Sequence, residues 1–140
     1  MHGDSMEQEL INQLLALPGE TIHLEKGEFL FHEGDIADHF FIVREGRLSI
    51  KKFEASGHIF AHRLVGPNNV LGEIPLYETN TRTYVFNAIA REKCSVYSIR
   101  YDVLEPAIAK DHSLAIAMMK IYTLHMRRQP AKYRDLLLYG

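Results

Sequence analysis

The sequence predicts a mainly β domain, a sandwich or jelly roll, with helices flanking it at both ends. Between Thr21 and about Arg100, short apolar or alternating runs are separated by clusters of turn residues, which is typical of such architectures. Outside this region the apolar residues recur at intervals of three and four, as they do in amphipathic helices. A chain of 140 residues is the right size for one compact domain with its own core.

A first helix is predicted over residues 6–15. Ser5 and Gln8 have the spacing of a capping box at its start, and Pro18-Gly19 ends it. The seven segments that follow have the length and composition of strands. They are Thr21–Leu24, Glu28–Phe31, His39–Val43, Arg47–Phe53, Ile59–Val65, Tyr84–Ala90 and Ser95–Arg100.

Two further helices are predicted after the strands. Asp102 caps a short helix over Val103–Ala109, and a longer helix begins near Asp111 and runs at least to Gln129. The longer helix carries two apolar stripes. One stripe consists of Leu114, Ala117, Ile121 and Leu124, and the other of Ala115, Met119, Tyr122 and Met126.

A helix that is apolar on two faces must bury both of them. We expect one face of the long helix to pack on the β domain and the other to form a parallel coiled-coil dimer, with the contact along Leu114, Ala117, Ile121 and Leu124. The alternative is a helix that is fully buried within a single domain.

The composition excludes several classes of protein. The net charge of −2 lacks the basic excess of a nucleic-acid surface. The single cysteine, Cys94, rules out an internal disulfide framework or a four-thiolate iron–sulfur site, and its apolar surroundings predict a buried thiol. The sequence has neither a signal peptide nor an apolar run of about 18 residues that could span a bilayer. We therefore expect a soluble, cytoplasmic protein.

Residues 72–83 carry the strongest functional signal. Gly72 lets the backbone approach a ligand closely, and Arg82 offers a planar guanidinium that matches phosphate oxygens. Thr83 adds a hydroxyl donor, and Glu73 is an acceptor suited to sugar hydroxyls. Phosphate and ribose recognition in one short segment predict a nucleotide site.

Two motifs in this sequence are jointly specific. The first is the stretch from Phe31 to Gly46, with a glycine, an acid, a small residue, four apolar residues and a second glycine. The second is the Gly72-to-Thr83 segment. Together they resemble the cyclic-nucleotide-binding sensor domain of the CRP/FNR family of bacterial transcription regulators, and the resemblance spans roughly residues 20–138.

The resemblance implies a double-stranded β-helix, or jelly roll, followed by a long C-terminal dimerisation helix. It divides the chain into an N-terminal helix (1–19), a β-roll (20–101) and a pair of helices (102–140). The family's winged-helix DNA-binding domain would follow beyond residue 140, so this chain is expected to lack it. The implied partners are a second copy of the chain, DNA through the absent domain, and RNA polymerase for the full-length regulator; no membrane is involved.

The resemblance also implies roles for single residues. The counterpart of Glu73 accepts from the ribose 2′-hydroxyl, those of Arg82 and Thr83 hold the cyclic phosphate, and backbone from Gly72 through Ile74 lines the pocket. The implied effector is a cyclic nucleotide, cAMP or cGMP, with no obligatory cofactor.

Two departures from the family pattern leave alternatives open. Pro75 cannot donate an N–H where many ligand-binding members have alanine or glycine. Residues 129–133 lack the Thr-Ser pair that meets adenine in members that bind cAMP, although Lys132 or Tyr133 could meet a base instead. The domain could therefore sense another metabolite or serve as a ligand-free dimerisation scaffold, with Arg82 paired to Glu73 or Glu78.

A cupin-like metalloenzyme is a remote alternative. Its metal site needs a His-x-His pair, which does not occur in this sequence. His58 and His62 are four apart, and the other histidines are scattered. We expect solvated or locally hydrogen-bonded histidines, no metal site and no enzymatic activity.

Overall fold

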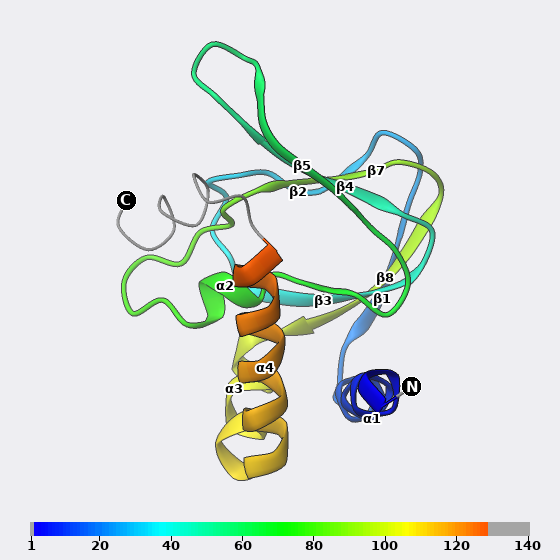
Figure 1. The fold of residues 1–140 in the computed structure, drawn as a ribbon, viewed down its shortest axis with the longest axis vertical. Coiled ribbons are helices and arrows are strands. Elements are labelled where there is room, and N and C mark those ends of the chain that lie inside the picture. The colour runs from blue at the N-terminus through cyan, green and yellow to red at the C-terminus, as the bar shows by residue number, and fades with distance from the viewer. Residues whose placement is uncertain (1, 129–140) are drawn as a thin grey trace.

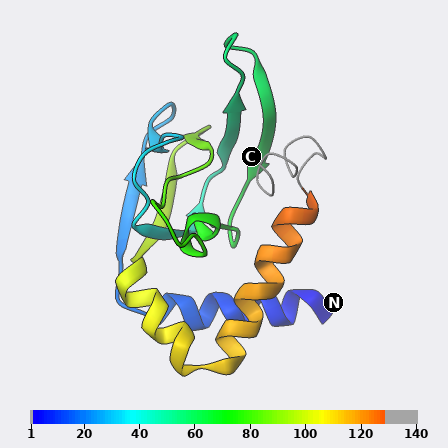
Figure 2. The ribbon, with the colours of Figure 1, turned by 90° about the vertical axis from the view of Figure 1, so that its left-hand side faces the viewer.

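Two four-stranded antiparallel sheets form the centre of the protein in this computed structural model, and three longer helices gather at one end of them (Figures 1 and 2). The structure describes residues 2–128, with the side chains of residues 2–7, 60, 61, 125, 126 and 128 excepted. One sheet has the order β1-β8-β3-β6 and the other β2-β7-β4-β5. The strands are β1 (Glu20–Leu24), β2 (Phe29–Phe31), β3 (His39–Glu45), β4 (Leu48–Phe53), β5 (Ile59–Val65), β6 (Val70–Leu71), β7 (Asn87–Ala90) and β8 (Cys94–Arg100). The helices are α1 (His2–Leu15), α2 (Glu73–Leu76), α3 (Tyr101–Lys110) and α4 (His112–Arg128).

The core lies between the sheets and under the helices. Phe40, Ile42 and Ile99 from the first sheet and Leu48 and Ala88 from the second are all fully buried, at 0% exposure. Leu14 of α1, Leu104 of α3 and Met118 of α4 extend this core beneath the helices. The predicted mainly β fold with flanking helices is confirmed, because two four-stranded antiparallel sheets form the centre of the protein and helices precede and follow them.

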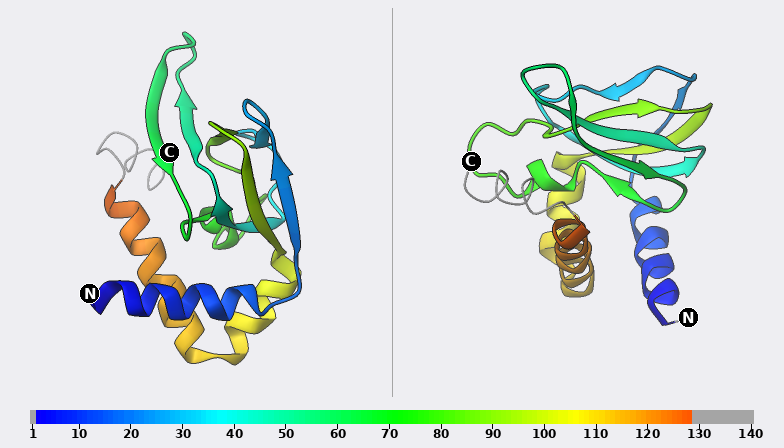
Figure 3. Two further views of the ribbon diagram at one scale, coloured as in Figure 1. Left: turned by 90° about the vertical axis from the view of Figure 1, so that its right-hand side faces the viewer. Right: turned by 45° about the horizontal axis from the view of Figure 1, so that its top comes forward.

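The β4–β5 hairpin projects away from the helices, as Figures 1 and 3 show. β5 pairs with β4 on one side only and is therefore an edge strand. The register Leu48↔Val65 and Ile50↔Arg63 places Val65 and Arg63 on one face of the hairpin.

The predicted helix starts are partly corrected. α1 begins at His2, so Ser5 lies inside the helix and does not cap it. α3 begins at Tyr101, so Asp102 lies in its first turn. The Asp102 carboxylate does not cap the helix, because its Oδ1 accepts from the side-chain Nε of Arg100 (3.0 Å) and not from a backbone N–H of the first turn. Asp111 does cap α4, because its Oδ1 accepts from the backbone N–H groups of residues 113 and 114. The predicted end of this helix near Gln129 lies outside the described residues, as does the 129–133 stretch.

Two short elements and one strand start also differ from the sequence prediction. β6 and α2 span two and four residues, which is too short for a periodic pattern to reveal. The predicted strand from Tyr84 begins only at Asn87. The backbone of Tyr84 bonds to Gly34 and Asp35, and this pairing holds it on the loop before β3.

One face of α4 packs on the body of the protein and another faces outward. Leu114 and Met118 are buried in the core, and Ala117 and Ile121 pack against it. Ile116 and Met119 are 53% and 63% exposed. The predicted stripe that contains Leu114 is thus largely occupied within the chain. No helix within residues 2–128 is long and apolar enough to cross a membrane.

Candidate ligand-binding site

Gly72 is the residue from which the candidate site is built. Its φ of 83° lies in the left-handed region, and it forms the N-cap of α2. A Cβ at this position would lie 2.9 Å from the carbonyl oxygen of His39. The hydroxyl of Tyr101, at the start of α3, donates to the carbonyl of Gly72. Only glycine suits this position, and α3 helps to hold it.

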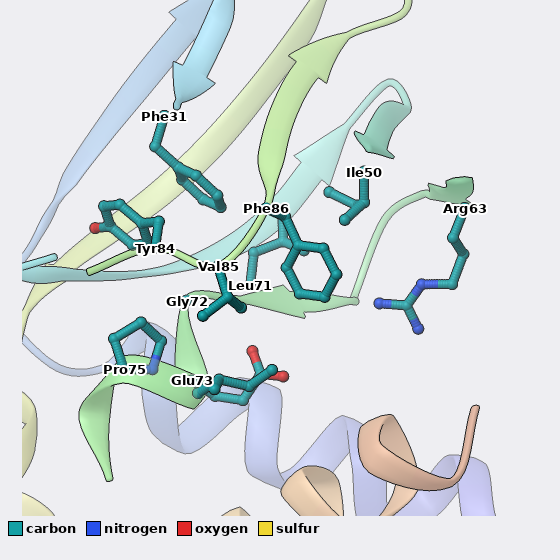
Figure 4. Close-up of a pocket in the computed structure, with 11 residues that line it drawn as sticks. Phe31, Ile50, Arg63, Leu71, Gly72, Glu73, Pro75, Tyr84, Val85 and Phe86 are labelled. Atoms are coloured by element: carbon teal, nitrogen blue, oxygen red, sulfur yellow. The ribbon is translucent and has the colours of Figure 1, made fainter. Parts of the chain in front are cut away.

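A small pocket lies beside Gly72, between the sheets and α2 (Figure 4). Its cavity volume of about 20 Å³ is room for roughly one water molecule. The described residues that line it are Phe31, Ile50, Arg63, Leu71, Gly72, Glu73, Ile74, Pro75, Tyr84, Val85 and Phe86. The predicted residues Gly72, Glu73 and Ile74 are in this set, whereas Arg82 and Thr83 are not.

Aromatic rings close one side of the pocket. The rings of Phe31 and Tyr84 stack with centroids 4.0 Å apart. The Tyr84 hydroxyl donates to the carbonyl of His39 (2.9 Å) and accepts from its backbone N–H (3.2 Å). Burial raises the pKa of Tyr84 to about 12, so its hydroxyl remains a donor at neutral pH. The Tyr84 ring is therefore a fixed part of the wall.

Glu73 places a carboxylate on the wall of this largely apolar pocket. It is only 4% exposed and belongs to the first turn of α2. In Figure 4 its carboxylate lies beside Phe86, on the side from which Arg63 approaches. This position gives the pocket a hydrogen-bond acceptor for donors such as hydroxyl groups.

Arg82 points away from the pocket toward α3. Its Nη1 lies 2.6 Å from Oε1 of Glu105, and its Nη2 lies 3.3 Å from Oε2. Its Nε donates to the carbonyl of Glu78, and its guanidinium carbon lies 5.5 Å from the centre of the Tyr101 ring. The hydrogen bond to Glu105 raises the pKa of Arg82 above its usual value. The carboxylate that Arg82 meets is thus Glu105, which the sequence did not suggest.

The two sequence motifs come together next to this site. Ala37 donates its backbone N–H to the carbonyl of Arg82 at 2.9 Å, and Thr83 forms an isolated β-bridge with Ile36. Thr83 is half-buried, and its backbone is held by the loop before β3. The pairing explains why two segments about 40 residues apart carry the resemblance jointly.

Arg63, Phe86 and Tyr84 are pocket residues that the sequence reasoning missed. Arg63 stands in the run Ile59–Val65, two positions before the buried Val65 and therefore on the same face of the strand. A charged residue on the buried face of a predicted strand is unusual, and this signal in the sequence could have identified Arg63 as a pocket residue.

His39 and His58 make local contacts. His39 Nδ1 lies 2.6 Å from Asp38, and His58 Nδ1 lies 3.3 Å from the hydroxyl of Ser56. Within the described part of the chain, no three His, Cys, Asp or Glu side chains gather into a group that could hold a metal ion. Cys94 is buried, as predicted, and burial raises the pKa of its thiol.

Comparison with known proteins places this chain in a family. Residues 21–111 match the sequence model of the cyclic nucleotide-binding domain. The anaerobic regulatory protein of Bacillus subtilis is 30% identical over 117 residues, which cover 84% of this chain and 49% of that protein. The CRP-like cAMP-activated global transcriptional regulator of Mycobacterium tuberculosis is 21% identical over 118 residues, covering 84% of this chain and 52% of that protein. The chain spans about half the length of these curated relatives.

The solved structures agree with the family match. The crystal structure of a transcriptional regulator from Thermotoga maritima superposes with a TM-score of 0.75 and 22% identity, covering 93% of this chain and 98% of that one. This likeness shows a shared fold. Because the family model covers well over half of the 140 residues, the chain belongs to the cyclic nucleotide-binding domain family, in the group found in CRP/FNR-type transcription regulators.

Proposed function

We propose that this domain senses a small anionic effector, such as cAMP or cGMP, for a CRP/FNR-type transcription regulator in the cytoplasm. The effector binds in the pocket beside Gly72. The observation that carries this proposal is the position of Glu73, a 4% exposed carboxylate on the wall of an otherwise mostly apolar pocket. A carboxylate in that position is an acceptor for the hydroxyl groups of a ribose.

Binding must be coupled to a change in the pocket walls. A small-molecule site usually has a volume of roughly 300 Å³ or more, whereas the cavity here measures about 20 Å³. The effector therefore selects an opened arrangement of the protein, and this differential binding is what allows it to act as a signal.

The pocket is connected to the C-terminal helices by three contacts. Tyr101 of α3 bonds to Gly72, Glu105 of α3 pairs with Arg82, and Tyr77, just after α2, meets Tyr122 of α4 edge to face with ring centroids 4.9 Å apart. We propose that opening the pocket shifts α3 and α4 through these contacts. The shift then reaches a DNA-binding domain outside this chain.

Dimerisation through α4 is part of the same proposal. Ile116 and Met119 form an exposed apolar face on this helix. Next to it, a groove of about 300 Å³ runs between α1 and α4, with Leu10 and Ala117 on its walls. A second copy of the chain would cover the exposed pair, as in other helix pairs that bury an apolar stripe.

Calorimetric titration of the protein with cAMP and with cGMP tests the effector. We expect saturable binding by the wild type and at least about tenfold weaker binding by Glu73→Gln, which loses a charge-assisted acceptor. Glu92→Gln, which alters an exposed pair with Arg47 away from the pocket, is the control. A folded wild type that binds neither nucleotide would refute a cyclic-nucleotide effector.

A dimerisation scaffold is the second candidate function. The pocket is nearly filled by its own aromatic wall, and Pro75 on that wall has no N–H to offer a ligand. A scaffold would give the same melting temperature with and without nucleotide, whereas a ligand that binds only the folded state raises it with concentration.

A further inference from the structure

A second cavity lies between the residues that follow α1, the strands β1, β3 and β8, and the start of α3. Its volume is about 280 Å³, against about 20 Å³ for the pocket beside Gly72, and no described residue lines both. Small-molecule sites usually have a volume of roughly 300 Å³ or more. This cavity is therefore already open enough to hold a small ligand.

The register of the first sheet places four polar side chains of this cavity on one face. Ser98 of β8 lies opposite Glu20 of β1. Arg100, two positions further along β8, lies opposite His39 of β3. Residues two apart on a strand share a face, and so do residues directly opposite each other on neighbouring strands. Donors and acceptors from three strands thus meet around one cavity.

The hydroxyl of Ser98 is the group that points to a ligand. Ser98 is only 5% exposed, and its side chain has no hydrogen-bond partner among the described residues. Buried polar groups in folded proteins nearly always have a partner, because leaving one unpaired costs free energy. Since Ser98 lines the cavity, a molecule inside the cavity is the partner that would satisfy it.

The end of β8 and the start of α3 favour the anionic part of such a ligand. Arg100 uses Nε and Nη2 for Asp102, which leaves its Nη1 without a partner among the described residues. The side chains of this pair are 60% and 66% exposed, so the pair holds the guanidinium only weakly. The first turn of α3 borders the cavity through Val103 and has no side-chain cap, so the positive end of the helix adds to the attraction.

Glu20 and His39 offer acceptors on the same face. The carboxylate of Glu20 has no ion-pair partner among the described residues. The Nδ1 atom of His39 lies 2.6 Å from Oδ1 of Asp38. In a neutral imidazole this contact keeps the proton on Nδ1 and makes Nε2 an acceptor. Both groups suit a ligand that carries an ammonium.

We propose that this cavity binds a free α-amino acid, with its carboxylate at Ser98 and Arg100 and its ammonium at Glu20 and His39. A zwitterion satisfies both kinds of group, whereas a simple anion would meet the carboxylate of Glu20 and a simple cation would meet the guanidinium of Arg100. The inference does not rest on the proposed function, because the two sites share no lining residue within the described part of the chain.

Calorimetric titration of the protein with each of the twenty common L-amino acids tests this site. Two reference compounds accompany the amino acid that binds best: the same molecule without its amino group and the same molecule without its carboxylate. The variants are Ser98→Ala, Glu20→Gln and Arg100→Gln, and their melting temperatures verify that each is folded.

We expect the best amino acid to bind at least about tenfold more tightly than either reference compound. Each of the three variants should lose about tenfold or more in affinity, because each removes a hydrogen bond that involves a charged group. Without ligand, Ser98→Ala should melt no lower than the wild type, since the hydroxyl that it removes has no partner among the described residues. A purely structural serine would show the opposite combination.

Matched control variants carry the same changes away from the cavity. Ser49→Ala replaces a 6% exposed serine of the other sheet, and Arg47→Gln and Glu92→Gln alter an exposed ion pair. All three should bind the amino acid as the wild type does.

Three outcomes would overturn this proposal. One is a folded wild type that binds none of the twenty amino acids. The second is equal binding of an amino acid and of its analogue without the amino group. The third is unchanged affinity in folded Ser98→Ala and Arg100→Gln.

Discussion

Arg82 and Glu105 form a two-pronged ion pair, with 2.6 Å between Nη1 and Oε1 and 3.3 Å between Nη2 and Oε2. The pair joins the loop after α2 to the middle of α3. Tyr101 makes a second connection from the same helix to Gly72. α3 is therefore attached near both ends of the segment that carries the resemblance.

Removing the charge of Glu105 should loosen this attachment more than it destabilises the fold. The side chains of Arg82 and Glu105 are 30% and 46% exposed, so we expect Glu105→Gln to lower the free energy of unfolding by no more than about 1 kcal/mol. Amide hydrogen exchange in the first turns of α3 should become faster. Glu92→Gln breaks a pair of similar exposure elsewhere and should leave this exchange unchanged; equal acceleration in both variants would contradict the attachment.

Gly72→Ala should be costly for two separable reasons, strain at a φ of 83° and crowding against His39. Gly57 has a φ of 91° and nothing within 4 Å of an added Cβ, so Gly57→Ala measures the strain alone. We expect about 1–2 kcal/mol for Gly57→Ala and a larger loss for Gly72→Ala in urea unfolding. Equal losses would mean that close packing at Gly72 has no energetic weight.

Tyr84→Ala should cost about 3 kcal/mol, because it removes a buried ring that stacks on Phe31. Tyr84→Phe keeps the ring and loses the hydrogen bonds to His39, for which we expect about 1 kcal/mol. Denaturant unfolding of both variants separates packing from hydrogen bonding. If the two losses were the same, the ring would not be a structural part of the pocket wall.

The exposed face of α4 should control oligomeric state without affecting the monomer fold. Met119→Glu changes a side chain that is 63% exposed, so we expect a dimer to dissociate with little change in unfolding of the monomer. Leu114→Ala should instead destabilise the fold by about 2–5 kcal/mol, because Leu114 is buried within the chain. Sedimentation equilibrium of Met119→Glu is the measurement, and an unchanged dimer would place the contact elsewhere.

Asp111 should make the start of α4 sensitive to acid. Hydrogen bonds from Ser113 and from the backbone of Leu114 lower its pKa below the ordinary value of 3.8. A carboxylate whose pKa is lower in the folded state contributes stability above pH 3.8, and this contribution is lost as the pH falls through the lowered pKa. Asp111→Asn keeps a capping oxygen without the charge, so its melting temperature should lack this part of the pH dependence. Identical pH profiles would exclude Asp111 as the cause.

Sequence patterns located most of the β-roll because period-two alternation and glycine-containing turns are local properties. Six of the seven predicted strands agree with the structure to within two residues at each end, and α4 begins at His112, next to Asp111, where its start was predicted. The starts of α1 and α3 were wrong because side chains of the Ser and Asp type suit both caps and first turns. β6 and α2 were missed because elements of two and four residues are too short to show a periodic pattern.

The sequence by itself determined the family and the fold class, because turn glycines and strand alternation are encoded residue by residue. It also carries the prediction of a candidate site around Gly72 and Glu73. Only the tertiary structure decided which arginine faces the pocket and which face of α4 is exposed. Arg82 meets Glu105 across 23 positions, and Arg63 reaches the pocket through a register with Ile50. Such contacts depend on how strands and helices pack. A long arginine side chain can point in several directions, and the folded chain decides which partner lies within its reach.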